Sequence, residues 1–199
     1  MIDVNLIMAA QNQDEDAFRT IFNQYYKKIY KTSYFILMDS SQAEDVVQET
    51  LLQVYLKINK LSDVLSFERW VYRITVNTCY EFMRKKNNKN EYSLEDFLEI
   101  FPNSLVSAEI SPENSMMQNE LQRKVLEAIY KLPLKHRIVV ILYYYNDMNI
   151  NEIANVTKSL QGTVKSRLFY ARKILKKSLT EEQANFIEKN NGGVLYEHR

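Results

Sequence analysis

The sequence predicts an all-helical protein of two small domains that are joined by an acidic linker. Its 199 residues include only three glycines and three prolines, far fewer turn-forming residues than a β-rich fold needs. Hydrophobic residues make up 46% of the chain, which is enough for a packed core. Apolar residues recur at helical spacing, and no stretch shows the alternation of a strand.

The charges are segregated along the chain, although the net charge is only +1. Residues 1–90 carry 12 basic and 11 acidic side chains, whereas residues 91–122 carry 7 acidic and no basic ones. Residues 123–177 carry 12 basic and 3 acidic side chains, a net charge of +9. A basic domain of this kind is suited to bind a polyanion. We therefore expect a first domain, an acidic linker, a basic second domain and a tail, at residues 1–90, 91–119, 120–179 and 180–199.

Three helices are predicted in the first domain, over about 14–38, 43–58 and 67–86. The middle one has the clearest apolar stripe, formed by Ala43, Val46, Val47, Thr50, Leu51, Val54, Tyr55 and Ile58. Its opposite face is polar and includes Asp45, Gln48 and Glu49. A short polar loop over 60–66 precedes the third helix.

In the second domain, a helix over about 120–132 is interrupted by Pro133, and another stretch covers 136–145. Two further helices are expected between 149 and 179, and residues 188–199 have the composition of a frayed end.

Residues 149–177 have the pattern of a helix-turn-helix. Asn149 can cap the first helix, with Glu152 placed to close a capping box. The second helix has no acidic residue between Lys158 and Lys177. A solvated basic face on a structural helix is the simpler interpretation, but the capped preceding helix and the missing acids favour DNA binding. The candidate DNA-contacting residues are Lys165, Ser166, Arg167, Phe169, Tyr170 and Arg172.

Two sets of motifs resemble those of bacterial sigma factors. Four segments resemble domain 4 of that family: Leu132-Pro133-Leu134-Lys135-His136-Arg137, Asn151-Glu152-Ile153-Ala154, Gly162-Thr163-Val164-Lys165-Ser166-Arg167-Leu168 and Ala171-Arg172-Lys173. Domain 2 is resembled by Ala43-Glu44-Asp45-Val46-Val47-Gln48-Glu49-Thr50 and by the segment from Trp70 to Thr78. The short chain with only a linker between these domains resembles the extracytoplasmic-function (ECF) group.

The resemblance implies a promoter-specificity subunit that has no catalytic activity, cofactor or metal. It implies that Asp45, Gln48 and Glu49 dock on the β′ clamp helices of core RNA polymerase, whose β subunit is also a partner. The −10 promoter element would be bound by Arg73, Asn77, Arg84 and Lys85, and the −35 element by the helix-turn-helix. Residues 60–66 would hold a base flipped from the non-template strand. An anti-sigma factor is a further expected partner.

Several interpretations stay open at this point. A stand-alone helix-turn-helix regulator is the alternative function. Trp70 is either a core anchor or a base-stacking platform, and the acidic linker is either a mimic of nucleic acid or a disordered tether. The corner Lys158-Ser159-Leu160 lacks the usual glycine of the family, and Tyr170 stands where arginine or histidine is frequent.

The sequence also bears on localisation. Cys79 lies in an apolar run and is expected to be a buried, inert thiol. No basic residue precedes Arg19, and the longest apolar run, 138–145, is too short to cross a bilayer. We therefore expect a cytoplasmic protein without membrane insertion.

Overall fold

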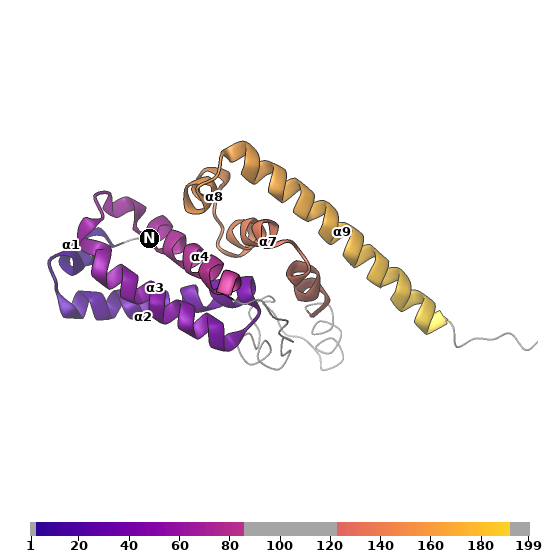
Figure 1. Cartoon of the computed structure of the whole chain (residues 1–199), viewed down its shortest axis with the longest axis horizontal. Coiled ribbons are helices and arrows are strands. Elements are labelled where there is room, and N and C mark those ends of the chain that lie inside the picture. The colour runs from indigo at the N-terminus through magenta and orange to yellow at the C-terminus, as the bar shows by residue number, and fades with distance from the viewer. Residues whose placement is uncertain (1–2, 86–122, 192–199) are drawn as a thin grey trace, which may run out of the picture.

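The computed structural model describes residues 3–85 and 123–191, with side chains as far as residue 180. Over these residues the chain is helical without a strand, as the sequence predicts (Figure 1). The elements are α1 (Val4–Gln11), α2 (Glu15–Leu37), α3 (Ser40–Lys57), the 3₁₀ turns η1 (Ile58–Lys60) and η2 (Val64–Ser66), α4 (Phe67–Lys85), a helical stretch over 123–130, α7 (Leu134–Val140), the π turn η3 (Ile141–Tyr145), α8 (Ile150–Thr157) and α9 (Gln161–Asn191).

Helices α1 to α4 form the first unit, a bundle in which α3 packs against both α2 and α4. Helices α1, α2 and α3 each follow an aspartate whose carboxylate accepts hydrogen bonds from the first turn, which fixes where each helix begins. The buried cluster inside this bundle is made of one apolar stripe per helix, including Ile21 and Ile29 from α2, Val47, Leu51 and Val54 from α3, and Phe67 and Val71 from α4.

The second unit contains the remaining helices, in which α7 and α8 pack against α9. Val164, Leu168 and Ala171 form the buried stripe of α9 and lie at helical spacing. The π turn η3 continues directly from α7. At its end the Asn146 N–H donates to Ile141 O, five residues earlier, at 3.1 Å.

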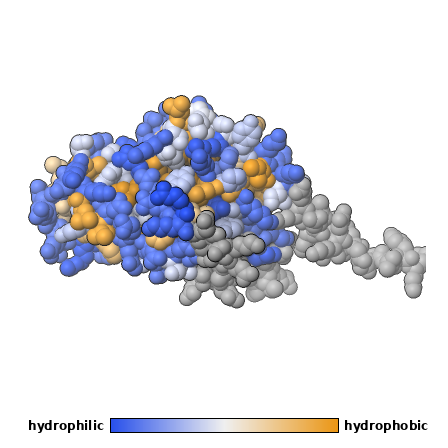
Figure 2. Space-filling view, in the orientation of Figure 1, coloured by the Kyte–Doolittle hydropathy of each residue, from blue (hydrophilic) through white to orange (hydrophobic). Residues whose placement is uncertain are grey.

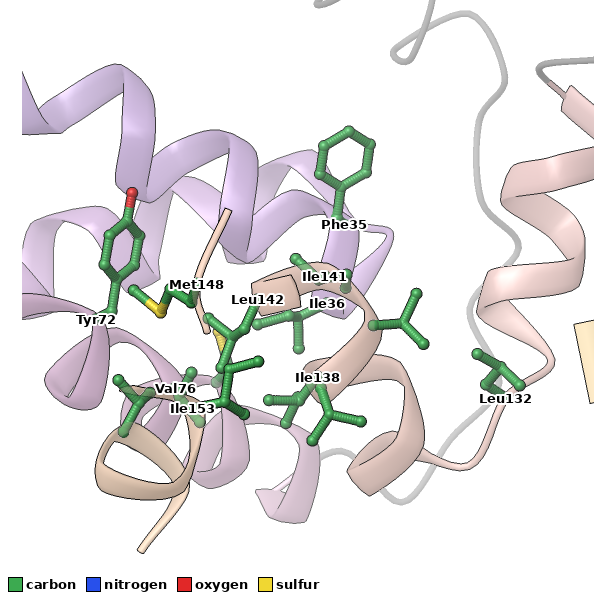
Figure 3. Packing of buried hydrophobic residues seen from close by; sticks show 14 of the residues in the cluster. Phe35, Ile36, Tyr72, Val76, Leu132, Ile138, Ile141, Leu142, Met148 and Ile153 are labelled. Atoms are coloured by element: carbon green, nitrogen blue, oxygen red, sulfur yellow. The ribbon is translucent and has the colours of Figure 1, made fainter. Parts of the chain in front are cut away.

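The two units pack against each other across a buried layer that we call the seam. Figure 3 shows side chains of both units pointing toward one another there. The first unit contributes Tyr34 to Met38, Ala43, Val46, Tyr72, Val76 and Cys79, and the second contributes Leu132, Ile138, Ile141, Leu142, Met148 and Ile153 among others. The sequence did not predict this contact, because an amphipathic pattern shows that a face is buried but not which partner buries it.

Arg137 is a charged residue inside the seam, where its side chain is 5% exposed. Its guanidinium donates to Ile36 O of α2 at 2.7 Å, and also to Tyr130 O and Leu132 O. Because Ile36 lies in the last turn of α2, its carbonyl has no partner within that helix. Arg137 supplies that partner and thereby ties α7 to the end of α2. Burial lowers the pKa of Arg137 from its ordinary value.

A second polar link crosses the seam at Asn146. Its side-chain amide donates to the Thr32 hydroxyl of α2 at 2.9 Å. The Tyr72 phenol lies beside the same pair, and burial raises its pKa to about 12, so it is protonated at neutral pH.

The corner between α8 and α9 is tight. Lys158 ends α8 in the left-handed conformation, with φ 48° and ψ 45°. The N–H groups of Lys158 and Ser159 both donate to Ala154 O. The Ser159 hydroxyl accepts a hydrogen bond from Arg167 at 3.0 Å, and α9 begins at Gln161. The lysine therefore adopts the backbone conformation that glycine usually supplies at such a corner.

Several sequence expectations differ from the structure. Helix α1 was not predicted, and two 3₁₀ turns shape the expected loop over 60–66. The sequence assigns Tyr55 to the buried stripe, but its side chain is 55% exposed, because its ring packs only edge to face on that of Phe18, at 4.8 Å between centroids. Helix α9 continues to Asn191, into the segment expected to fray. Gly162, in the first turn of α9, faces open space: apart from its own helix, no atom lies within 4 Å of the Cβ position that another residue would have there.

The acidic linker lies outside the described residues, so the domain boundaries stay predictions. Within the described parts of the chain, no helix is both long and apolar enough to span a membrane.

Replacing Arg137 with alanine should destabilise the protein. The substitution leaves three main-chain carbonyls without a donor, one of them inside the seam. We expect the free energy of unfolding to fall by about 3 kcal/mol, since one hydrogen bond to a charged group contributes roughly 1.5–3 kcal/mol. Urea unfolding followed by circular dichroism measures the change. Lys135→Ala, at an exposed position of the same helix, is the control and should change stability by less than about 0.5 kcal/mol. Equal effects of the two variants would contradict this role of Arg137.

Replacing Lys158 with glycine should stabilise the protein by about 0.5–1 kcal/mol. Glycine removes the cost of the left-handed conformation, which is about 1–2 kcal/mol for lysine. This gain exceeds the stability that is lost because glycine gives the unfolded chain more conformational entropy. Thermal unfolding is a suitable measurement. Lys173→Gly makes the same chemical change at an exposed position inside α9 and should cost about 1 kcal/mol. A loss of stability in both variants would show that the corner stores no strain.

Candidate functional site

The helix-turn-helix has the capping box that the sequence predicts. The Asn149 side chain accepts hydrogen bonds from the N–H groups of Asn151 and Glu152, at 3.0 and 3.1 Å. In return, the Glu152 carboxylate accepts from the Asn149 N–H at 2.9 Å. These bonds fix the first turn of α8 and thus the direction in which α8 leads into the corner before α9.

The solvent-facing side of α9 carries most of the residues that the sequence marks for DNA contact. Lys165 and Ser166 are exposed in its second turn. Phe169 and Tyr170 follow, 64% and 53% exposed, with their rings edge to face at 5.5 Å between centroids. Large aromatic side chains this exposed gain nothing from the core, so they are available to a binding partner.

The two arginines of this set have different surroundings. Arg167 is half-buried and is turned toward the corner by its hydrogen bond to Ser159. Arg172 is exposed, and its Nε donates to the Tyr144 hydroxyl at 2.8 Å. Arg172 therefore remains open to an anion, whereas Arg167 is already engaged within the protein.

Helix α4 carries the residues expected at the −10 element. Asn77, Arg84 and Lys85 are exposed, whereas Arg73 is half-buried. Arg84 lines a groove of about 560 Å³ between the end of α4 and the start of α7. Arg73, Asn77 and Arg84 thus follow one side of α4, with Lys85 about a quarter turn away, and they are not equally accessible.

Arg73 lies in a crevice between α4 and α8. The crevice has a volume of about 190 Å³ and is lined by Ser66, Arg69, Trp70, Arg73 and Asn155. Asn155 belongs to α8, so the second unit forms one wall of a site whose other residues come from the first unit. Trp70 packs against the buried cluster beside Phe67, with ring centroids 6.0 Å apart, and it also lines this crevice. The indole therefore anchors the helix, and its role as a base-stacking platform stays a prediction.

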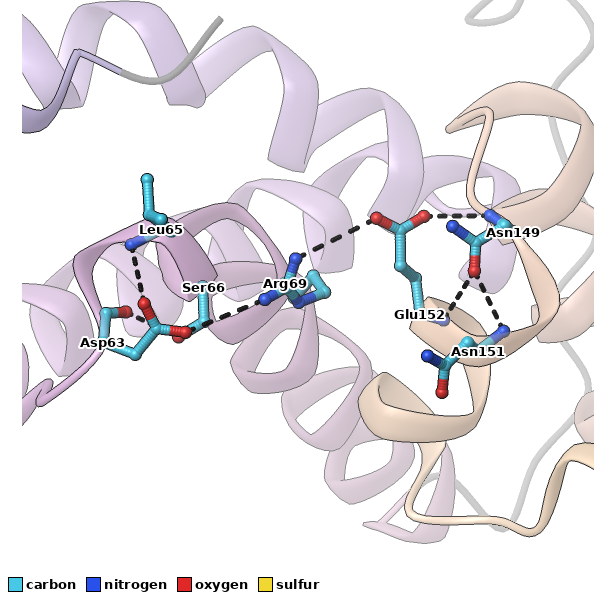
Figure 4. A network of polar contacts seen from close by, with 7 residues as sticks. All are labelled: Asp63, Leu65, Ser66, Arg69, Asn149, Asn151 and Glu152. Carbon is cyan, nitrogen blue, oxygen red and sulfur yellow. Dashed lines mark hydrogen bonds and ion pairs between the residues drawn. The ribbon is translucent and has the colours of Figure 1, made fainter.

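A chain of polar contacts links the loop before α4 to the helix-turn-helix (Figure 4). Arg69 lies 3.9 Å from the Asp63 carboxylate and 4.0 Å from that of Glu152. Asp63 also accepts from the Leu65 N–H at 3.0 Å, which holds the loop in its turn. Glu152 thus closes the capping box with one oxygen and faces Arg69 with the other. Ion pairs this exposed add little stability, so they orient the two units more than they hold them together.

The outer face of α3 is the third candidate surface. Asp45 and Gln48 are exposed, and Glu49 is half-buried and accepts a hydrogen bond from Gln53 at 2.8 Å. The same face continues with Leu52 and Leu56, which are 53% and 59% exposed. Sequence reasoning missed these two leucines, although their spacing of four residues outside the buried stripe is a detectable signal. The face is therefore polar in its first half and apolar in its second.

The visible face of the molecule is mainly hydrophilic, with small apolar patches (Figure 2). One of these patches lies over the end of the molecule that α1 to α3 form. Exposed Phe22, Tyr26 and Tyr55 add to the apolar character of the first unit. Exposed apolar side chains gathered in this way are typical of a protein-binding surface.

No group of three or more histidine, cysteine, aspartate or glutamate side chains lies close enough to hold a metal ion within residues 3–85 and 123–180. Cys79 is fully buried, and burial raises the pKa of its thiol to about 12, as expected for an inert cysteine.

Comparison with known families and proteins identifies both units. Residues 21–89 match the sigma-70 region 2 family and residues 122–175 match the sigma-70 region 4 family. The chain is 32% identical over 181 residues to the ECF RNA polymerase sigma factor SigW of Bacillus subtilis, covering 88% of this chain and 95% of SigW. It is 30% identical over 179 residues to the ECF RNA polymerase sigma-E factor of Escherichia coli K12, covering 88% and 93% of the two chains.

Two solved structures share the fold. The structure of CnrH in complex with the cytosolic domain of CnrY has a TM-score of 0.67 at 19% identity, covering 91% of this chain and 99% of that one. The sigma factor RpoE of Bartonella quintana in complex with the anti-sigma factor NepR has a TM-score of 0.60 at 21% identity, covering 82% and 96%. Region 2 and region 4 thus occur in order, and relatives match along nearly their whole length. This chain belongs to the ECF family of RNA polymerase sigma factors.

Proposed function

We propose that this protein directs bacterial RNA polymerase to promoters as its specificity subunit, without catalysing a reaction itself. One observation carries the proposal: regions 2 and 4 occur in one chain, and each exposes a different binding surface. Region 4 exposes the acid-free side of α9, and region 2 exposes the outer face of α3. A stand-alone regulator would need only the first of these, so that alternative is set aside.

The −35 element is the proposed ligand of α9. A recognition helix reads base edges with its first turns and contacts phosphates with later residues. Lys165, Ser166 and Phe169 occupy the early exposed positions, where lysine can donate to guanine and an aromatic ring can contact a thymine methyl group. Tyr170 extends this surface. Arg167 supports the corner, so its proposed contact with DNA requires that its bond to Ser159 be exchanged for one to a phosphate.

The −10 element is the proposed ligand of α4. Asn77 offers an amide that can pair with a base, and Arg84 and Lys85 add charge for the phosphates. On α4, Trp70 and Arg73 combine an aromatic edge with a cation, a chemistry suited to an unstacked base once α8 has moved away from them. A pocket for an extruded base offsets part of the cost of opening the duplex.

Core RNA polymerase is the proposed partner of the outer face of α3. Exposed Asp45 and Gln48 provide polar contacts at one end of this face, and Leu52 and Leu56 provide an apolar anchor at the other. Interfaces typically combine an apolar centre with a polar rim. The two leucines therefore extend the surface expected from Asp45, Gln48 and Glu49 alone.

Promoter binding requires the two regions to separate. The positions that name the −35 and −10 elements differ by about 25 base pairs, which is roughly 85 Å along straight duplex DNA. In this structure only α8 lies between α4 and the start of α9, so the two DNA-facing surfaces are about two helix diameters apart, roughly 20 Å. The 37 residues over 86–122 can span at most about 120–130 Å when extended, which is long enough for the separation.

The family also suggests how such a protein is controlled. We propose that it acts in the cytoplasm and that an anti-sigma factor holds it inactive until an extracytoplasmic signal arrives. Two proteins of similar structure were solved in complexes, one with the cytosolic domain of CnrY and one with the anti-sigma factor NepR. A partner that stabilises the closed arrangement, in which the two units pack together as in this structure, would keep the two DNA-facing surfaces too close together to reach both promoter elements.

Run-off transcription with core polymerase tests the function. We expect promoter-dependent transcripts from fragments of the source genome only when the protein is added.

Gln48→Ala and the pair Leu52→Ala with Leu56→Ala should weaken core binding, the pair by about 1–2 kcal/mol, without changing promoter preference. Lys165→Ala should weaken −35 recognition by about 1–3 kcal/mol while core affinity is kept. Asn23→Ala, at an exposed position of α2, is the control for core binding. Failure of the wild-type protein to support initiation on every fragment would refute the proposal.

Reversible cross-linking of the seam tests the separation. Arg69→Cys and Asn155→Cys face one crevice, and they are combined with Cys79→Ala, because the native Cys79 lies in the seam and becomes accessible to a thiol reagent when the regions separate. A short bis-methanethiosulfonate joining the two new thiols should reduce transcription at least about tenfold, because the surfaces cannot then reach both elements. A reducing agent should restore it. Each single variant, treated in the same way, is the control. Full activity in the cross-linked state would show that the closed arrangement can bind a promoter.

A further inference from the structure

Arg172 is held between two tyrosines of the π turn η3. Its guanidinium carbon lies 5.5 Å from the ring centroid of Tyr143 and 5.6 Å from that of Tyr144. The two rings meet edge to face at 4.9 Å. The Nε–H of Arg172 donates to the Tyr144 hydroxyl at 2.8 Å. One tyrosine therefore fixes the arginine by both its ring and its hydroxyl.

The π turn explains how two consecutive residues can contact the same arginine. A π turn holds more residues than an α turn, so successive side chains diverge less around the helix axis. The hydrogen bond from the Asn146 N–H to Ile141 O marks this wider turn. Tyr143 is half-buried against the seam, and Tyr144 stands 59% exposed at its edge. The pair thus extends from the protein core to the surface on which Arg172 lies.

The remaining donors of Arg172 are free. Among the described residues, the two terminal nitrogens of its guanidinium take part in no ion pair or hydrogen bond, and α9 has no acidic residue from Gln161 to Lys177. A guanidinium whose Nε is engaged still presents two parallel terminal N–H groups. That edge matches the spacing of two phosphate oxygens.

We propose that Tyr144 is a positioning residue that presents Arg172 to a phosphate of the −35 element. This inference rests on the proposed function. Arg172 lies seven residues after Lys165, about 10 Å further along the axis of α9, so it falls at the edge of the groove that the first turns enter. A free arginine loses rotamer freedom when it binds. The clamp removes most of that freedom before DNA arrives, and preorganisation of this kind increases affinity.

Tyr144→Phe is the sharpest variant, because it removes only the hydroxyl and keeps the ring. Holoenzyme reconstituted with core polymerase is titrated with a fluorescent duplex carrying the promoter that the wild-type holoenzyme transcribes best. We expect Tyr144→Phe to weaken binding about threefold, since Arg172 is then less preorganised and loses more rotamer freedom when it binds. Arg172→Ala should weaken it more, by about tenfold, and the double variant no further than Arg172→Ala alone. Tyr145→Phe is the matched control, because that tyrosine belongs to the same turn but packs on Phe35, at 4.6 Å between centroids.

Salt dependence separates positioning from a general structural effect. The slope of log affinity against log salt should fall by about 0.9 in Arg172→Ala, because one phosphate contact is lost. Tyr144→Phe should keep the wild-type slope at lower affinity. Equal thermal stability of Tyr144→Phe and wild type shows that the fold is retained.

Three results overturn the inference while leaving the proposed function intact. They are unchanged affinity in Tyr144→Phe, additive losses in the double variant, and a wild-type salt slope in Arg172→Ala. A wild-type holoenzyme that neither binds nor transcribes any promoter fragment refutes the proposed function, and this inference with it.

Discussion

The hydrogen bond from buried Arg137 to Ile36 O is the contact on which the arrangement of the two regions depends. Helix α2 ends inside the seam, so its last carbonyls need donors that water cannot supply there. One terminal nitrogen of the guanidinium is such a donor. The other terminal nitrogen donates to the carbonyls of Tyr130 and Leu132, in the turn before α7. The guanidinium also lies over the Tyr130 ring at 4.4 Å. No carboxylate pairs with it among the described residues. The partial negative charge at the end of α2 takes that role, which makes the bond dependent on the two regions being in place.

The composition of the seam suits a contact that forms and breaks. A permanent interface resembles a protein core and excludes polar groups, whereas a separable one must leave both surfaces soluble. Beside the apolar layer, the seam holds the Asn146 amide against Thr32 and the phenol of Tyr72. Each of these groups can exchange its partner for water when the regions part. The exposed pair of Arg69 and Glu152 at the rim is equally easy to break, since solvent competes for both charges.

Local features were predictable from the sequence, and long-range ones were not. The capping box of Asn149 and Glu152, the apolar stripe of α9 and the all-helical fold follow from patterns within a few turns of chain. Tyr55 was misjudged because the periodicity of α3 places it at the edge of the stripe, and only packing decides such a position. Lys158 is a second position that the local sequence does not decide. Its left-handed backbone is dictated by the corner rather than by its own preference. The Tyr144–Arg172 contact joins residues 28 positions apart, and no local pattern marks it.

The placement of the surfaces sets an order of events. Helix α3 turns Ala43 and Val46 into the seam and turns Asp45, Gln48, Leu52 and Leu56 outward. The face proposed for core polymerase is therefore complete while the regions are still packed together. The −10 surface is not, because Asn155 of α8 closes the crevice that holds Arg73. In the proposed function, core polymerase can therefore engage the closed arrangement, whereas promoter DNA needs the two regions apart. A ligand shifts an equilibrium only toward the state that it binds better. Core polymerase therefore favours the open arrangement only if it also binds region 4, at a site distant from the one that binds region 2. The chain between Lys85 and residue 123 is long enough for that second contact, which on the proposed function separates α4 from α9.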